Sequence, residues 1–109
     1  MANEYNTNGG ILMSDNNMAK QKFEEGMSDF LSGNYDRSIT QFSAALDADS
    51  SFKLALKSRG AAYLKSNKLQ DAIADFDRLT EMDPNNARAY HMRGLAYEKT
   101  GDFGRALED

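Results

Sequence analysis

The chain has 109 residues, a length typical of one domain, and 40% of them are hydrophobic, which is enough for a modest core. Its formal net charge of −4 gives no indication of a nucleic-acid-binding protein, and the absence of cysteine excludes disulfides and thiolate-bound metals. No apolar run approaches the roughly 20 residues that a membrane-spanning helix needs, so we expect no membrane insertion.

The N-terminal residues 1–17 are rich in Asn, Gly, Ser and Asp, a composition typical of a flexible tail. They lack a basic segment followed by an apolar stretch, so we expect no signal peptide and a cytoplasmic protein. Ile11, Leu12 and Met13 are their one apolar cluster. Two interpretations stay open: a disordered terminus without a function, or a segment whose apolar cluster docks on the folded domain.

An amphipathic helix is predicted from Met18, because apolar residues then recur at the spacing of one helix face. This face consists of Phe23, Met27, Phe30 and Leu31. Gly33 ends the helix. A second amphipathic helix follows over about 35–46, and residues 47–51 supply turn and N-cap side chains for the next helix.

Three more complete helices are predicted, over about 52–66, 69–82 and 87–100. Asn67 ends the first because it accepts a left-handed conformation, and Gly101 ends the last for the same reason. Pro84 ends the middle one because proline cannot continue the backbone hydrogen bonds. A sixth helix begins near Asp102 but has only about two turns, too few to be stable alone.

The helices recur with a period of 34 residues, which is typical of an array of helix–turn–helix repeats. Columns of like residues carry the period: Gly26, Gly60 and Gly94; Ser38, Ala72 and Ala106; Phe42 and Phe76. Glycine inside a helix costs about 1 kcal/mol relative to alanine, so its repetition predicts that the partner helix passes too close for a Cβ. The two phenylalanines are expected to fill the space between successive helix pairs. We predict an all-α, right-handed α-solenoid of antiparallel helix pairs with about six helices.

These columns resemble the tetratricopeptide repeat (TPR) family. The best match is residues 55–86, where the signature columns hold Gly60, Tyr63, Ala72, Phe76 and Pro84. Residues 87–109 match through Tyr90, Gly94, Tyr97, Gly101, Phe103 and Ala106. The first repeat matches less well, because Asp29, Ser38 and Ser50 replace the usual Tyr, Ala and Pro. The resemblance implies a repeat domain over residues 18–109, with repeats at about 19–52, 53–86 and, incomplete, 87–109.

The resemblance also implies a function in protein binding, since members of the family generally bind peptides or helices of other proteins. The first helix of each pair lines the concave groove in this fold. The groove residues of this chain would then be Lys20, Phe23, Met27, Phe30, Lys57, Ala61, Leu64, Lys65, Arg88, His91, Leu95 and Glu98. The first helices of repeats two and three are mostly basic and the intervening second helix is mostly acidic, which predicts a basic groove and an acidic back.

We therefore hypothesise a scaffold or adaptor whose groove takes a protein or peptide partner with an acidic segment near repeats two and three. An apolar anchor would lie near Phe23 and Met27. The alternative is that these cations are a solvated helix face without a function, because exposed ion pairs contribute at most about 1 kcal/mol. Some TPR proteins bind the C-terminal Glu-Glu-Val-Asp of heat-shock chaperones; in that register the matching positions are Phe23, Met27, Ser58, Arg88 and Met92, and only Arg88 fits.

No catalytic constellation, metal site or cofactor site is evident, so we expect no enzymatic activity and no cofactor. His91 is the one histidine, which excludes a multi-histidine metal site. The second candidate function is structural: the incomplete third repeat leaves the helix over 87–100 without a cap. Two explanations stay open, a piece of a longer repeat protein or a chain that self-associates, as a homodimer, through this C-terminal end.

Overall fold

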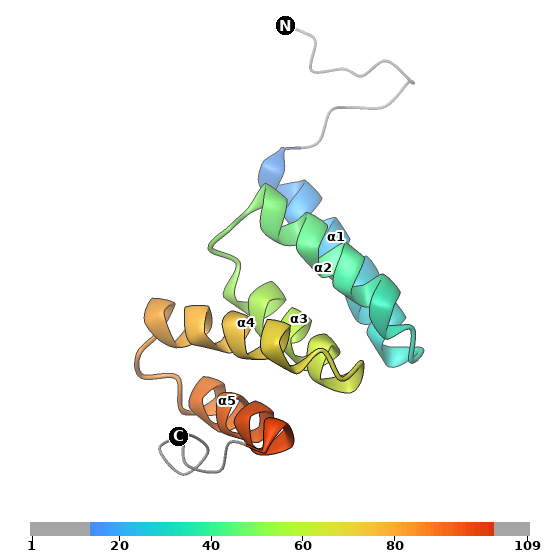
Figure 1. Ribbon diagram of the computed structural model, residues 1–109. Helices are drawn as coiled ribbons and strands as arrows, with labels where there is room; N and C mark the ends of the chain where they lie inside the picture. The colour runs from blue at the N-terminus through green and yellow to red at the C-terminus, as the bar shows by residue number, and fades with distance from the viewer. Residues whose placement is uncertain (1–13, 102–109) are drawn as a thin grey trace, which may run out of the picture.

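The computed structural model of the protein describes residues 14–101. Within this range the chain forms five helices, with no strand (Figure 1). The helices are α1 (Asp15–Leu31), α2 (Tyr35–Ala48), α3 (Lys53–Lys65), α4 (Leu69–Met82) and α5 (Ala87–Thr100). The all-α fold is confirmed. The flexible tail predicted for residues 1–13 and the sixth helix predicted for residues 102–109 lie outside the described residues.

The helices are arranged as consecutive pairs. Each helix packs on the next one in the chain, and α3 also contacts both α1 and α5. Figure 1 shows α2 in front of α1 and α4 in front of α3. The first helices of the pairs, α1, α3 and α5, therefore form one layer, and α2 and α4 form the other. This arrangement is the predicted solenoid of helix pairs. The layer formed by α1, α3 and α5 lines the groove described below.

Most helix ends follow the sequence prediction. Asn67 and Gly101 adopt the expected left-handed conformation, with φ of 62° and 89°. The first helix begins at Asp15 rather than near Met18, because the Ser14 side chain accepts a hydrogen bond from the Asn17 amide at 3.1 Å and caps it. The expectation missed this cap because no apolar residue marks that turn.

The turn before α3 differs from the expectation that residues 47–51 would cap this helix. Asp49 Oδ1 accepts hydrogen bonds from the amide and the hydroxyl of Ser51, at 3.0 and 2.8 Å. The N-cap residue is Phe52, which has no side-chain acceptor. Asp49 therefore stabilises the turn, and it is too far back in the chain to cap the helix.

The repeated glycines are explained by aromatic packing within each pair. A Cβ on Gly26 would lie 2.6 Å from the ring of Phe42, and one on Gly60 would lie 2.7 Å from the ring of Phe76. Both rings are fully buried. The expected close approach is thus made by a side chain and not by the partner helix backbone. Each ring lies on the glycine of its own pair. Phe76 also belongs to a buried cluster that includes Ala96 of α5, so this ring fills space between successive pairs as expected.

The core is continuous from one pair to the next. One buried cluster joins α4 and α5 through Phe76 and Ala96, and a second joins α3, α4 and α5 through Leu56, Leu79 and Ala89. Because these clusters span the boundary between the second and third repeats, α3 and α5 are held in fixed positions relative to each other.

Candidate binding groove

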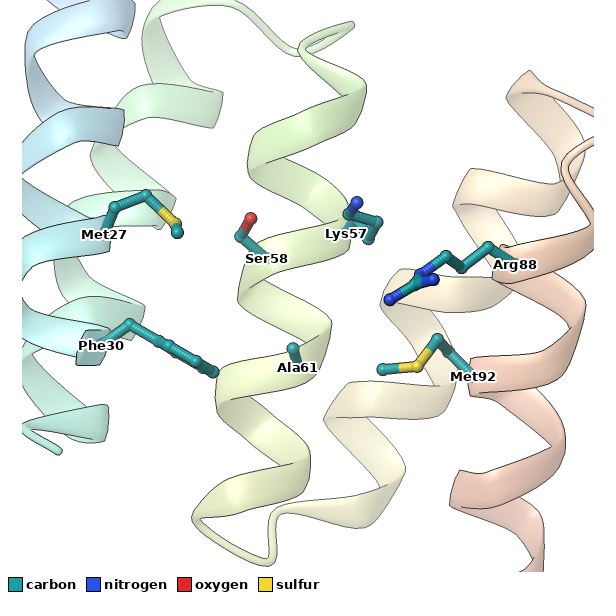
Figure 2. A pocket seen from close by; sticks show the side chains of 7 residues that line it. All are labelled: Met27, Phe30, Lys57, Ser58, Ala61, Arg88 and Met92. Atoms are coloured by element: carbon teal, nitrogen blue, oxygen red, sulfur yellow. The ribbon is translucent and has the colours of Figure 1, made fainter.

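A pocket of about 140 Å³ lies where the exposed faces of α1, α3 and α5 meet (Figure 2). Each of the three first helices contributes to it. Seven residues line it: Met27, Phe30, Lys57, Ser58, Ala61, Arg88 and Met92. The pocket thus lies in the groove that the fold predicts, across all three repeats.

The pocket exists because small residues on the central helix are flanked by long residues on its neighbours. Ser58 and Ala61 of α3 lie in the middle. Figure 2 shows Met27 extending toward them from the α1 side and Met92 from the α5 side. A larger residue on α3 would fill this space. The side-chain sizes on α3 therefore determine whether the groove is hollow here.

The lining has an apolar part and a cationic part. Met27, Phe30 and Met92 are apolar, and Lys57 and Arg88 are basic. No acid is among the lining residues. Within residues 14–101, neither Lys57 nor Arg88 forms an ion pair. The two cations are therefore available to an anionic partner.

Another cation of α3, Arg59, lies on the opposite side of the helix from Lys57. Its Nε and Nη2 donate to Asp75 Oδ2 and Oδ1 at 2.8 and 2.7 Å, and its Nη1 donates to Ser43 Oγ at 3.0 Å. The Asp75 side chain is only 7% exposed. Burial raises the pKa of Asp75 above its ordinary value, although the hydrogen bonds from Arg59 act in the opposite direction. The hydrogen bond to Asp75 raises the pKa of Arg59. Arg59 is thus a packing residue and does not face the groove.

Arg93 of α5 follows Arg59 by 34 residues, and it bonds to Asp77, which follows Ser43 by the same step. Its Nη1 donates to Asp77 Oδ1 at 2.9 Å, and its guanidinium lies 5.3 Å from the centre of the Tyr90 ring. Two acids of α4, Asp75 and Asp77, therefore bind arginines of the first helices. The expected separation of a basic groove from an acidic back is weaker than the sequence suggested, because these charges meet between the two layers.

The structure brings together five of the twelve residues predicted for the groove. These are Met27, Phe30, Lys57, Ala61 and Arg88.

Three others are elsewhere in the fold. Lys20 and Phe23 line a separate hollow near the N-terminal end of α1, beside Phe52. Leu64 packs against the buried cluster of α4 and α5. The remaining four, Lys65, His91, Leu95 and Glu98, are exposed and do not line the pocket.

The sequence interpretation missed Ser58 and Met92 as pocket residues. Both stand at positions that would hold polar or charged side chains in the register of chaperone-binding TPR proteins, and neither carries a charge in this chain. That register was a usable signal, because Met27, Ser58, Arg88 and Met92 all line the pocket. The fifth position of that register, Phe23, lines the separate hollow instead.

The comparison with protein families agrees with this geometry. A family model described as TPR repeat matches residues 60–101. The chain belongs to the tetratricopeptide repeat family. The match covers the C-terminal half of α3 together with α4 and α5.

Several proteins are similar to this chain over most of its length. It is 28% identical to the NADPH oxidase activator of Dictyostelium discoideum over 89 residues, which cover 82% of this chain and 14% of that protein. It is 34% identical to protein unc-45 homolog B of Xenopus laevis over 89 residues, 79% of this chain and 10% of that protein. The chain thus spans only a small part of the length of these relatives.

A solved structure shows what one similar domain binds. The second TPR of Spaghetti (RPAP3), bound to the HSP90 peptide SRMEEVD, is 27% identical with a TM-score of 0.79, and the match covers 84% of each chain.

Within residues 14–101 of the present chain, no helix has the length and apolarity to cross a membrane. The same part of the chain has no group of acidic or histidine side chains able to hold a metal ion.

Proposed function

We propose that this TPR domain binds an acidic segment of a partner protein in the groove formed by α1, α3 and α5. The observation that carries the proposal is the position of Lys57 and Arg88: both line an apolar pocket, and no acid of residues 14–101 neutralises either one. The similar RPAP3 domain was solved with a peptide that contains three acids, which supports a ligand of this kind.

The chemistry of the lining fits an acidic ligand with apolar side chains. The guanidinium of Arg88 is planar and binds a carboxylate through two parallel hydrogen bonds, while Lys57 offers a compact point charge. Methionine is flexible and polarizable, so Met27 and Met92 adapt to apolar groups of different shapes. Carboxylates that bind beside these apolar walls are partly shielded from water, which strengthens their attraction to the cations.

The ligand proposed here is not the chaperone C-terminus. Among the positions that would hold the terminal carboxylate in that register, Met27, Ser58 and Met92 carry no charge, and Arg88 is the one cation. Apolar contacts therefore replace most of the charged contacts, and the proposed ligand is an acidic segment from any part of a partner chain.

Charge reversal tests the proposal. We expect a Lys57→Glu, Arg88→Glu variant to lose at least about tenfold in affinity for acidic peptides measured by fluorescence anisotropy, with an unchanged circular dichroism spectrum. The matched control is Arg37→Glu, Lys99→Glu, which changes the net charge equally at exposed positions outside the pocket. Equal affinity of the two variants would show that the pocket cations do not bind the ligand.

Three sequence-based expectations stay predictions. The first is self-association as a homodimer through the C-terminal end, where residues 102–109 lie outside the described range. The second is a cytoplasmic location. The third is the expectation that the chain is not an enzyme.

A further inference from the structure

The two kinds of side chain in the pocket are displaced from each other along the helix axes. On α5, Arg88 comes one turn before Met92, and on α3, Lys57 comes one turn before Ala61. Figure 2 shows both cations at the same end of the pocket, with Ala61 and Met92 at the other end. The pocket therefore has a cationic end, toward the N-termini of α3 and α5, and an apolar end.

The apolar end offers little to a carboxylate. Phe30, Ala61 and Met92, which lie at this end in Figure 2, have no side-chain hydrogen-bond donor, and a carboxylate placed among them would lose water without receiving replacement bonds. An aliphatic side chain placed there would lose unfavourable contact with water. The volume of about 140 Å³ is similar to that of a protein cavity of about 150 Å³ that binds benzene, so one side chain of about that size fits.

The distance between the two ends specifies the spacing in the ligand. One helical turn rises about 5.4 Å, and in an extended peptide the side chains of residues two apart point the same way at about 6.6 Å. An aliphatic residue at the apolar end therefore places an acid two positions away at the cationic end. Adjacent residues point to opposite faces and cannot make both contacts.

We infer that the pocket recognises an aliphatic residue of leucine or methionine size together with an acid two positions from it, within a partner segment that needs no free terminus. This inference rests on the proposed function and specifies its ligand. The aliphatic side chain occupies the hollow over Ser58 and Ala61, and the acid binds Lys57 and Arg88.

Short peptides with blocked termini test the inference by fluorescence anisotropy. The parent has one central leucine in a serine background, with a glutamate two residues away on each side, so that either binding direction is satisfied. One variant replaces the leucine with serine, and another moves both glutamates next to the leucine. We expect each variant to bind at least about tenfold more weakly than the parent.

A change in the protein provides the reciprocal test. Ala61→Leu fills the hollow, and leucine is a good helix former, so the fold should persist. We expect this variant to bind the parent peptide no better than wild type binds the leucine-free peptide. The matched control, Ala74→Leu on the exposed side of α4, should bind like wild type.

The outcomes separate the two proposals. If the leucine-free peptide binds wild type as tightly as the parent does, and charge reversal of Lys57 and Arg88 abolishes binding, the aliphatic anchor is wrong and the acidic groove stands. If the peptide with adjacent glutamates binds as tightly as the parent, the spacing is wrong. If the parent peptide shows no binding, the inference is overturned.

Discussion

Lys57 and Arg59 are two residues apart on α3, yet their side chains lie in opposite environments. Lys57 lines the groove pocket and has no ion pair within residues 14–101, whereas Arg59 donates three hydrogen bonds between the two helix layers. Two residues correspond to a rotation of about 200° around a helix. α5 shows the same division between Arg88, in the pocket, and Arg93, bound to Asp77.

The comparison shows that the charge of a helix does not give the charge of its exposed face. Each first helix has a groove face, which holds the pocket residues, and a packing face, which carries Gly26 and Gly60 and the buried contacts of Arg59. Changes on the packing face should alter stability, and changes on the groove face should alter binding. The four predictions below test this division.

The largest effect is expected from Asp75→Ala. The substitution leaves the guanidinium of Arg59 between the helix layers without its carboxylate, and loss of one partner of a buried pair costs about 3 kcal/mol of the free energy of unfolding. Urea denaturation measures this change. Arg88→Ala on the groove face is the control and should change stability by less than about 0.5 kcal/mol. Similar losses in both variants would contradict the division into two faces.

Gly60→Ala is expected to lower the free energy of unfolding by a smaller amount, about 1–2 kcal/mol. The added Cβ would lie 2.7 Å from the Phe76 ring, and this overpacking outweighs the gain in helix propensity. The free energy of unfolding again measures it. Phe76→Leu should make room for the new methyl group, so the double variant should be more stable than the sum of the two single changes predicts. Simple additivity would show that the ring is not what excludes a Cβ.

Asp77→Ser is expected to lower the free energy of unfolding by up to about 1 kcal/mol. The substitution replaces the ion pair of Arg93 with a hydrogen bond to a serine, the contact that Arg59 makes with Ser43. Asp77 is 44% exposed, so solvent weakens its ion pair. The reverse change, Ser43→Asp, should be neutral or slightly stabilising. Thermal denaturation of both variants measures the difference, and a clear loss of stability in Ser43→Asp would show that the two junctions between repeats are not equivalent.

The smallest effect concerns pH. Burial raises the folded-state pKa of Asp75 above its ordinary value of 3.8, so its protonated form is favoured by folding. The resulting stability is present below pH 3.8 and is lost as the pH rises through the folded-state pKa. We expect wild type to gain stability relative to Asp75→Asn as the pH falls from neutral through this window, measured by urea denaturation. A relative loss would mean that Arg59, and not burial, controls this titration.

The sequence by itself determined the fold and much of the groove. The period of 34 residues gave the helix pairs and their order, because each repeat must present the same small and large residues to its neighbours. Asn67 and Gly101 ended helices as expected, because local backbone conformation depends on the residue itself. The resemblance to the TPR family likewise implied that Met27, Lys57 and Arg88 lie on the groove side.

Only the tertiary structure decided which of these side chains share a pocket and which cations are neutralised. Arg59 meets Asp75 and Ser43, each 16 residues away in sequence, and no local pattern specifies that contact. The hollow over Ser58 likewise depends on how far the side chains of α1 and α5 extend over α3. A sequence pattern assigns a residue to a helix face, whereas a pocket or a buried ion pair depends on the distance between helices, which the packing of the whole array sets.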